Sequence, residues 1–454
     1  MTHAIFTPLL CMTVFAFLAA AAGWLAAKPV HAAALLLGLV FLDALHLPLV
    51  VNFGLSLYPE DLFFLILASA CMVRFCLFAS PRAVPWPWWV LGMIQLGLAV
   101  WGVKSYGTSA GVDARGHFYL WITLVFFASV RWSDRMVSRI VDLWIACGAG
   151  LCMLAIYRWG YSALDPRYAE EIMAYDTTGV RFRVISSAST LVIAIGSLGL
   201  LFRIMRGRLP LPLWPLLPVQ LAAIAVLQHR SVWISLFVGV ACLMLVRASG
   251  GKRIRALPLL GVVLVPLVLV FALPADNSVI ASVRSSADQA VSTKEGTMVG
   301  RVVYWDELMA KWLGAGIPTY LVGQAYGGGF SPSELDDGTK MDMVPHNHFL
   351  HILFRGGVIG LLATLWVFGS AWRAAFARTR QGDRYWAHFL LAAMSALYAY
   401  YIPYWANYDS GLLLGLAIGY LRSQRQAPMP IAPSRTVPRF AAPRLPASFR
   451  IGGP

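Results

Sequence analysis

The chain has 454 residues, of which 59% are hydrophobic and only 13% are charged. A soluble domain usually has about 25% charged residues, whereas long apolar runs of the kind that recur along this chain are typical of transmembrane helices. This composition excludes a soluble enzyme, a disordered scaffold and a secreted disulfide-rich protein. A β-barrel is disfavoured because its strands alternate between apolar and polar residues.

The net charge is +15, from 36 basic and 21 acidic residues. In a polytopic membrane protein this excess indicates the accumulation of Lys and Arg on the cytoplasmic face, and no nucleic-acid partner is expected. The six cysteines lie in or beside apolar runs without a CxxC pair. We interpret them as small buried hydrophobic residues and expect no thiolate metal site.

The hydropathy pattern predicts an all-α polytopic membrane protein with about 12–13 transmembrane helices. The apolar run at residues 5–26 lacks a basic segment before it and is followed by many others, so we interpret it as a span and not as a secretory signal. The expected spans are 5–26, 31–53, 57–79, 86–103, 117–130, 139–157, 184–204, 210–227, 231–247, 256–274, 346–370, 385–402 and 408–423. Thirteen spans would place the N-terminus outside, and twelve would place both ends inside.

Basic clusters fall on alternate connections, at 131–139, 203–208, 247–255 and 373–384, as a single cytoplasmic face requires. The long connection at 275–345 differs from them, because its nine acidic and five basic residues give it a net charge of −4. We therefore place this loop outside.

These features divide the chain into six regions. They are N-terminal transmembrane helices at 1–157, an outer (periplasmic) loop at 158–183, central helices at 184–274, a large outer (periplasmic) loop at 275–345, C-terminal helices at 346–423 and a disordered cytoplasmic tail at 424–454.

Arg230 lies in a short polar break between two apolar runs, in the segment Leu-Gln-His-Arg-Ser-Val-Trp at 227–233. Such a break holds the guanidinium at the outer rim, where arginine can grip phosphate oxygens in a bidentate fork. The alternative is an interfacial arginine that extends to lipid headgroups.

Arg301 begins a segment at 300–312 in which apolar residues recur with a helical period. This pattern predicts an amphipathic helix within the large outer loop, able to lie over the membrane surface as a lid. The alternative is that Arg301 pairs with Asp306 or Glu307 on a solvated face.

His346 follows Pro345 at the end of the large loop, and we expect it in the first turn of a membrane helix. Imidazole can take a proton from a hydroxyl, and a helix N-terminus would keep it neutral. Because His348 and His351 lie close by, a metal site is the alternative, but no zinc pattern accompanies them and we predict no metal.

The spacing His346-Asn347, nine residues, Gly357, two residues, Gly360 resembles the motif of bacterial O-antigen ligases and of the related O-antigen and exopolysaccharide polymerases. The arginine-bearing break and the large loop before the histidine resemble the layout of the same family. The resemblance covers about residues 180–420.

This resemblance implies a GT-C-type inner-membrane glycosyltransferase whose active site faces the periplasm. The donor would be a glycan linked through diphosphate to undecaprenol, with no metal and no cofactor. The acceptor would be another lipid-linked glycan in a polymerase or lipid A–core in a ligase, and other polysaccharide assembly proteins are possible partners. By analogy, His346 would be the base, while Arg230 and Arg301 would bind the diphosphate.

Further positions are expected to bind substrate: Arg181 and Arg183 at the outer start of a span, and Asn347 and His348 in the motif. The residues that flank Arg230 depart from the Ser-Arg-small pattern of ligases, which favours a polymerase slightly. The alternative from another class is a lipid-linked glycan transporter or flippase, although no internal repeat supports it.

Overall fold

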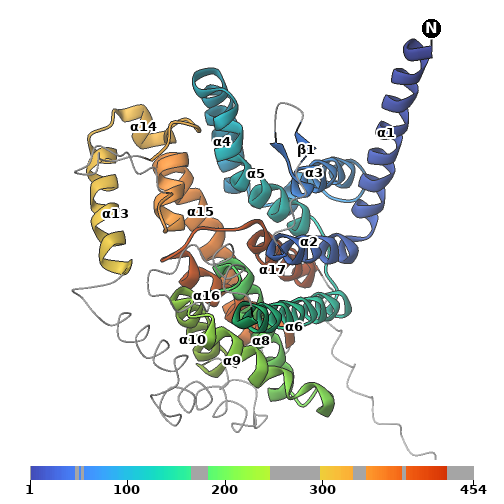
Figure 1. Cartoon of the computed structure of the whole chain (residues 1–454), viewed down its shortest axis with the longest axis vertical. Coiled ribbons are helices and arrows are strands. Elements are labelled where there is room, and N and C mark those ends of the chain that lie inside the picture. Colours follow the sequence, from blue (N-terminus) through green and yellow to red (C-terminus); the bar gives the residue numbers. More distant parts are fainter. Residues whose placement is uncertain are drawn as a thin grey trace, which may run out of the picture.

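The computed structural model describes residues 2–45, 51–52, 56–164, 183–245, 297–330, 344–380 and 385–426. Figure 1 shows a bundle of helices in this part of the chain, with α1 projecting from one side and α13 standing against the opposite side. The predicted span at 256–274, the basic cluster at 247–255, Arg181 and all of the tail beyond residue 426 lie outside the described residues.

The described helices confirm the predicted all-α membrane fold. They are α1 (Thr2–Ala27), α2 (Pro29–Ala44), α3 (Pro59–Leu77), α4 (Trp86–Tyr106), α5 (Thr108–Ala128), α6 (Asp134–Leu164), α8 (Ser187–Met205), α9 (Leu216–Val226), α10 (Arg230–Leu245), α13 (Thr297–Leu313), α14 (Ile317–Val322), α15 (His348–Arg380), α16 (Tyr385–Tyr401) and α17 (Tyr408–Gln426). Two 3-10 turns, η1 (Pro81–Ala83) and η2 (Leu211–Leu213), and a small antiparallel hairpin of β1 (Val51–Asn52) and β2 (Ser56–Leu57) accompany them.

Every predicted span within the described residues overlaps an α-helix. Of the described helices, α4, α6, α8 and α15 are long and apolar enough to cross a membrane, and α1 with α2 forms a further candidate bent by 110°. The expected total of 12–13 crossings stays a prediction. Large apolar side chains on α1 and α4, such as Phe15 and Met93, are exposed, as a lipid-facing surface requires.

Several boundaries differ from the prediction, since α5 begins at Thr108 and α15 ends at Arg380, each about ten residues beyond the expected span. Helix α6 continues to Leu164, so the start of the expected loop at 158–183 is helical. Helix α17 continues to Gln426, three residues beyond the predicted end of its span. Both helices extend into polar residues because a helix that is already formed adds one hydrogen bond for each further residue.

Helix α16 lies at the centre of the bundle, where it contacts α8, α10, α15 and α17. A hydroxyl chain links three of these helices at one end. The Tyr400 hydroxyl on α16 donates to Ser187 Oγ on α8 at 3.1 Å, and Ser187 Oγ lies 3.1 Å from Ser231 Oγ on α10. The side chain of Ser235 also donates to the carbonyl oxygen of Ala396 at 2.7 Å. These bonds fix α10 against α16 in an apolar core, where an unsatisfied polar group would be costly.

Helix α17 packs against α5 through a stripe of glycines. A Cβ atom on Gly411, Gly415 or Gly419 would lie within 2.8 Å of atoms of the chain between Leu120 and Val130. Glycines four residues apart share one face of a helix, and their missing side chains allow two helices to approach closely in a membrane.

The predicted amphipathic helix of the large loop is α13. Its Leu308 and Trp312 form a small core with Phe330 and with Leu353 and Phe354 on α15. Figure 1 shows α13 and α14 beside the first half of α15. The helix therefore packs on the bundle with its apolar face, while Asp306 and Glu307 are exposed.

The two motif glycines of α15 allow close packing against two different helices. Gly357 has φ +61° and interrupts the helix, and a Cβ atom there would lie 2.3 Å from the carbonyl of Leu321 at the end of α14. Gly360 instead faces α4, where a Cβ would lie 3.1 Å from Leu91. The kink at Gly357 thus lets α14 lie directly on α15.

We expect Gly357→Ala to lower the free energy of unfolding by about 2 kcal/mol or more, because strain at positive φ and overpacking each cost about 1–3 kcal/mol. Gly369→Ala is the matched control on the same helix, since no atom lies within 4 Å of a Cβ there. Thermal unfolding midpoints of both variants in one detergent test this. Equal midpoints would contradict the packing argument.

Candidate active site

Arg230 is held by a tight turn between α9 and α10. Gln228 adopts a positive φ of 54°, which reverses the chain within a few residues, and Arg230 is the first residue of α10. Trp233 Nε1 donates to the carbonyl oxygen of Ile224 at 2.9 Å and clamps the two helices. The prediction that this break fixes the position of Arg230 between two helices agrees with this geometry.

Arg183 approaches Arg230 from the segment that precedes α8. His229 Nε2 lies 2.9 Å from the carbonyl oxygen of Ile185, and Arg158 Nη1 donates to the carbonyl oxygen of Val184 at 2.7 Å. Burial and Arg183 lower the pKa of His229 to about 4, so this histidine is neutral and donates its bond to Ile185. Burial and then Arg183 also lower the pKa of Arg230.

Arg301 reaches the same region from α13. Its Nη1 donates to the carbonyl oxygen of Pro403 at 2.9 Å, in the connection between α16 and α17. Burial is the largest cause that lowers its pKa, and Arg183 and Arg230 lower it further. The alternative that Arg301 pairs with Asp306 or Glu307 is wrong, because the side chain turns inward and these acids are exposed.

His346 lies beside Arg301 and against two aromatic rings. Its ring stacks on Trp405 at 4.8 Å between centroids and lies 5.7 Å from Tyr404. The backbone N–H of His348 donates to the carbonyl oxygen of Tyr404 at 3.0 Å, which ties the start of α15 to the 402–407 connection. Within the part of the chain that the structure describes, Nδ1 of His346 is buried without a hydrogen-bond partner.

The structure corrects the expected position of His346. Helix α15 begins at His348, and Asn347 caps it: Asn347 Oδ1 accepts from the N–H groups of Phe349 at 2.9 Å and Leu350 at 3.1 Å. His346 therefore precedes the helix and does not lie in its first turn. The expected contact of Asn347 with substrate stays a prediction beside this capping bond.

The imidazole of His346 is neutral, as expected, but for a different reason. Burial lowers its pKa to about 4, and the nearby positive charge of Arg301 contributes. Desolvation and a like charge both disfavour the imidazolium, whereas the sequence had suggested the helix N-terminus as the cause.

The three motif histidines do not converge on one point. His348 is fully buried against Tyr401, with 4.5 Å between the ring centroids, and His351 packs against His117 at 4.3 Å. His348 thus occupies a packing position within the bundle, and its predicted contact with substrate gains no support from this position. No group of metal-binding side chains occurs among the described residues.

Sequence reasoning missed the aromatic connection at 402–407, which carries Tyr404 and Trp405. The dense run of tyrosines and tryptophan between 398 and 408 was the available signal, because such residues combine an apolar face with a polar tip. Burial raises the pKa of Tyr404, while Arg301 and Arg183 act to lower it. Tyr404 is thus a neutral hydroxyl beside the cations.

Fold and site together define a polytopic membrane protein in which three arginines and a neutral histidine gather at one end of the bundle. Such a site suits an anionic substrate group with a transferable proton nearby. The family model for O-antigen ligase matches residues 216–365. Comparison with curated proteins gives no match.

The matched segment contains Arg230, Arg301 and His346 together with Gly357 and Gly360. This segment of the chain is therefore similar to O-antigen ligases, in agreement with the resemblance that the histidine motif predicts. Arg183 lies outside the matched segment, and its place in the site comes from the fold.

The like charge of Arg301 gives a measurable effect on His346. We expect Arg301→Gln to raise the pKa of His346 above its value of about 4. That pKa should remain below the ordinary value of about 6.5 because burial persists. Wild-type His346 takes up a proton only as the pH falls through about 4, and the variant does so at higher pH.

A histidine-labelled sample titrated by NMR provides the measurement, with assignment by His346→Gln. Lys311→Gln, which removes another cation from α13, is the control and should leave the titration unchanged. An unchanged pKa in Arg301→Gln would show that the two groups are not electrostatically coupled.

Proposed function

We propose that the chain transfers a glycan from an undecaprenyl-diphosphate carrier to an acceptor hydroxyl on the periplasmic side of the inner membrane. The observation that carries this proposal is that Arg301 lies beside the neutral His346, while Arg183 and Arg230 lie close to Arg301. A diphosphate needs cations to stabilise its charge as it leaves, and an acceptor hydroxyl needs a base.

In the proposed step, a ring nitrogen of His346 takes the proton of the acceptor hydroxyl. The acceptor oxygen attacks the anomeric carbon, and the bond from that carbon to the diphosphate oxygen breaks with its electron pair. The leaving diphosphate keeps the negative charge, which the guanidinium groups stabilise in a partly dehydrated site. Attack opposite the leaving group inverts the anomeric carbon, and the step needs no metal ion.

Donor binding also prepares the base in this proposal. With no anion bound, Arg301 helps to hold the pKa of His346 at about 4, which makes it a weak base. A bound diphosphate offsets the positive charge of the arginines and so raises this pKa. Proton abstraction is thereby coupled to the presence of the donor.

We favour a polymerase of surface polysaccharide, O-antigen or exopolysaccharide, because His229 precedes Arg230 and Val232 and Trp233 follow Ser231. The second candidate is a ligase that uses lipid A–core, the activity that gives the matched family model its description. The two differ in the acceptor alone and share every step above.

Product analysis in nanodiscs tests the proposal. Purified protein is offered undecaprenyl-diphosphate glycan alone, and then together with lipid A–core. Longer lipid-linked glycan from the donor alone identifies a polymerase, whereas a product that requires lipid A–core identifies a ligase. Donor binding without any product would favour the transporter and overturn the enzyme.

The same assay tests the residues. We expect His346→Ala to lower kcat by about 10²–10⁴-fold, as for loss of a general base. Arg230→Ala and Arg301→Ala should each lower it by about 10²–10³-fold. Arg82→Gln, which removes an exposed cation of η1 that is not one of the site residues, should retain wild-type kcat. Turnover that persists in His346→Ala would contradict the assignment of His346 as the base.

A further inference from the structure

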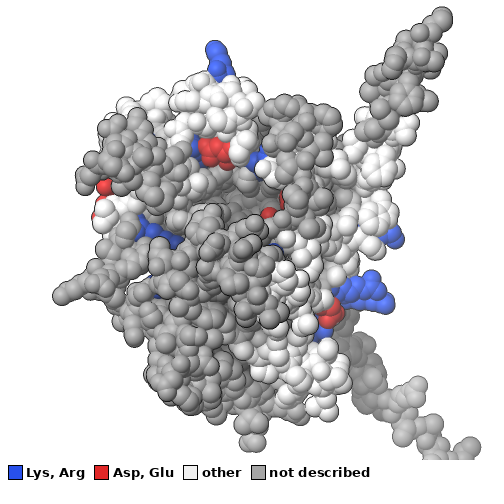
Figure 2. All heavy atoms as spheres, in the orientation of Figure 1, with Lys and Arg blue, Asp and Glu red and all other residues white. Residues whose placement is uncertain are grey.

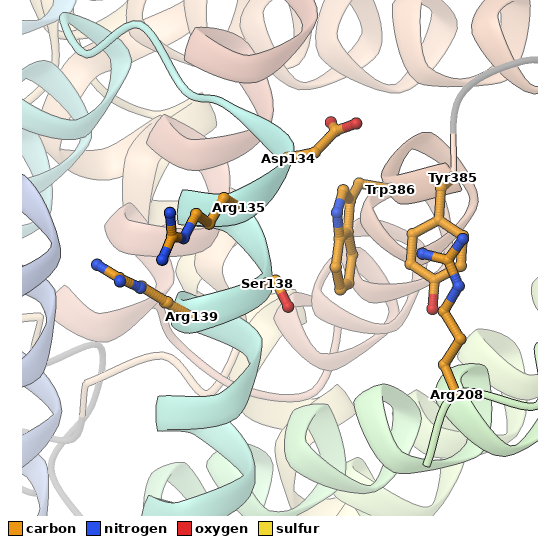
Figure 3. Close-up of a pocket in the computed structure, with 7 residues that line it drawn as sticks. All are labelled: Asp134, Arg135, Ser138, Arg139, Arg208, Tyr385 and Trp386. Carbon is orange, nitrogen blue, oxygen red and sulfur yellow. The ribbon is translucent and has the colours of Figure 1, made fainter.

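A second cationic site lies at the opposite end of the bundle from His346. A pocket of about 520 Å³ opens between the first turns of α6, the connection after α8 and the first turn of α16. Figure 3 shows Ser138 on the side of α6 that faces Trp386, Tyr385 and Arg208, whereas the side chains of Arg135 and Arg139, which also line the pocket, extend from the other side of the same helix.

Helices α16 and α8 establish that the two sites are far apart. Helix α16 begins at Tyr385, which lines the pocket, and ends at Tyr401; the ring of Tyr400 in its last turn lies 5.1 Å from that of Tyr404, which lies beside His346. Its 17 residues span roughly 25 Å at ~1.5 Å per residue. Helix α8 likewise begins at Ser187, in the hydroxyl chain with Tyr400, and carries Arg203 in its last turn at the pocket end.

Positive charge exceeds negative charge around the pocket. Arg135 and Arg139 are one helical turn apart on α6, and Arg206 and Arg208 approach from the connection after α8. Both nearby acids already have partners: Asp142 pairs with Arg203 at 2.5 Å, and Asp134 accepts from Tyr420 at 2.8 Å. Within the described residues, no carboxylate forms an ion pair with the other four arginines.

Aromatic rings position the cations that border this pocket. The guanidinium of Arg208 lies 4.3 Å from the centre of the Tyr385 ring, and that of Arg206 lies 5.7 Å from the same ring. Arg203 lies 6.0 Å from the centre of the Trp386 ring, and its Nη2 donates to Ser138 Oγ at 3.0 Å. Stacking on a ring leaves the edge of a guanidinium, with its N–H donors, available to an anion.

Figure 2 shows that most of the described surface on its face carries no charge, as expected for a protein surrounded by lipid. Basic pockets between membrane-spanning helices are suited to the phosphate of an anionic lipid headgroup, and tyrosine and tryptophan are the residues that anchor helices at that depth.

We propose that this pocket binds a phosphate group, supplied by the headgroup of an anionic phospholipid. Arg208, Arg135 and Arg139 provide the charge, and the hydroxyl groups of Tyr385 and Ser138 border the phosphate. The site is independent of the proposed transfer reaction, because it lies at the other end of α16 and needs neither donor nor acceptor glycan.

Native mass spectrometry of the full chain in detergent tests the proposal. The protein is titrated with phosphatidylglycerol, with phosphatidylcholine of the same acyl chains, and with soluble glycerophosphoglycerol. We expect phosphatidylglycerol to bind more tightly than phosphatidylcholine. Arg139→Gln and Arg208→Gln should each weaken it about fivefold, the usual effect of one cation near a lipid surface.

Arg82→Gln is the matched control, since it removes an exposed cation outside the pocket and should change the affinity less than twofold. Arg208→Lys keeps the charge but loses the planar fork and should fall between wild type and Arg208→Gln. The thermal midpoint of each variant in the absence of lipid checks that it is folded.

Two results would overturn the phosphate site: equal affinity for phosphatidylcholine and phosphatidylglycerol, or an equal loss in Arg82→Gln and the pocket variants. Binding of glycerophosphoglycerol that depends on Arg139 and Arg208 would support the phosphate pocket but identify a soluble phosphate as its ligand. Because the readout is lipid binding, failure here is distinct from a failure of glycan transfer.

Discussion

The gathering of positive charge around one neutral histidine is the constraint on which the rest of the site depends. Burial is the largest cause that lowers the pKa of Arg301 and of His346; Arg183 and Arg230 lower that of Arg301 further, and Arg301 lowers that of His346 further. Charges of one sign in a partly dehydrated space repel one another strongly. Neutral acceptors hold them in place, as where Arg301 bonds to the carbonyl oxygen of Pro403. An anionic substrate group would relieve the repulsion, so the unliganded fold is already arranged for one.

Such an arrangement requires a rigid frame, because mutually repelling side chains would otherwise separate. The frame is built from the hydroxyl chain through Tyr400, from the clamp of Trp233 on α9, and from the glycine stripe that brings α17 against α5. The kink at Gly357 adds to this frame, because it allows α14 to pack directly on α15. Helix packing thus holds the proposed catalytic residues in position. The 402–407 connection packs Tyr404 and Trp405 against His346.

The two ends of the bundle carry cations for different reasons. Near His346 the arginines are partly buried and close together, which suits a reaction that develops negative charge. At the first turn of α16 they are more exposed and lie against aromatic rings, which suits a lasting contact with a charged surface. A helix that holds both sites at a fixed separation would keep the proposed active site at a constant height relative to the lipid headgroups.

Local pattern alone predicted the helical membrane fold and the amphipathic helix α13, because hydrophobic period is a property of neighbouring residues. It also selected Arg230, Arg301 and His346 as candidate site residues, and their roles stay predictions. It began α15 two residues too early, at His346 and not at His348, since a capping side chain such as Asn347 decides where a helix begins. Only the tertiary structure brought Tyr404 and Trp405 to the histidine and Arg183 to the other two arginines, and separated His348 and His351 from His346. These contacts join residues far apart in the chain, and burial, which sets the pKa of His346, exists only once distant helices have packed together.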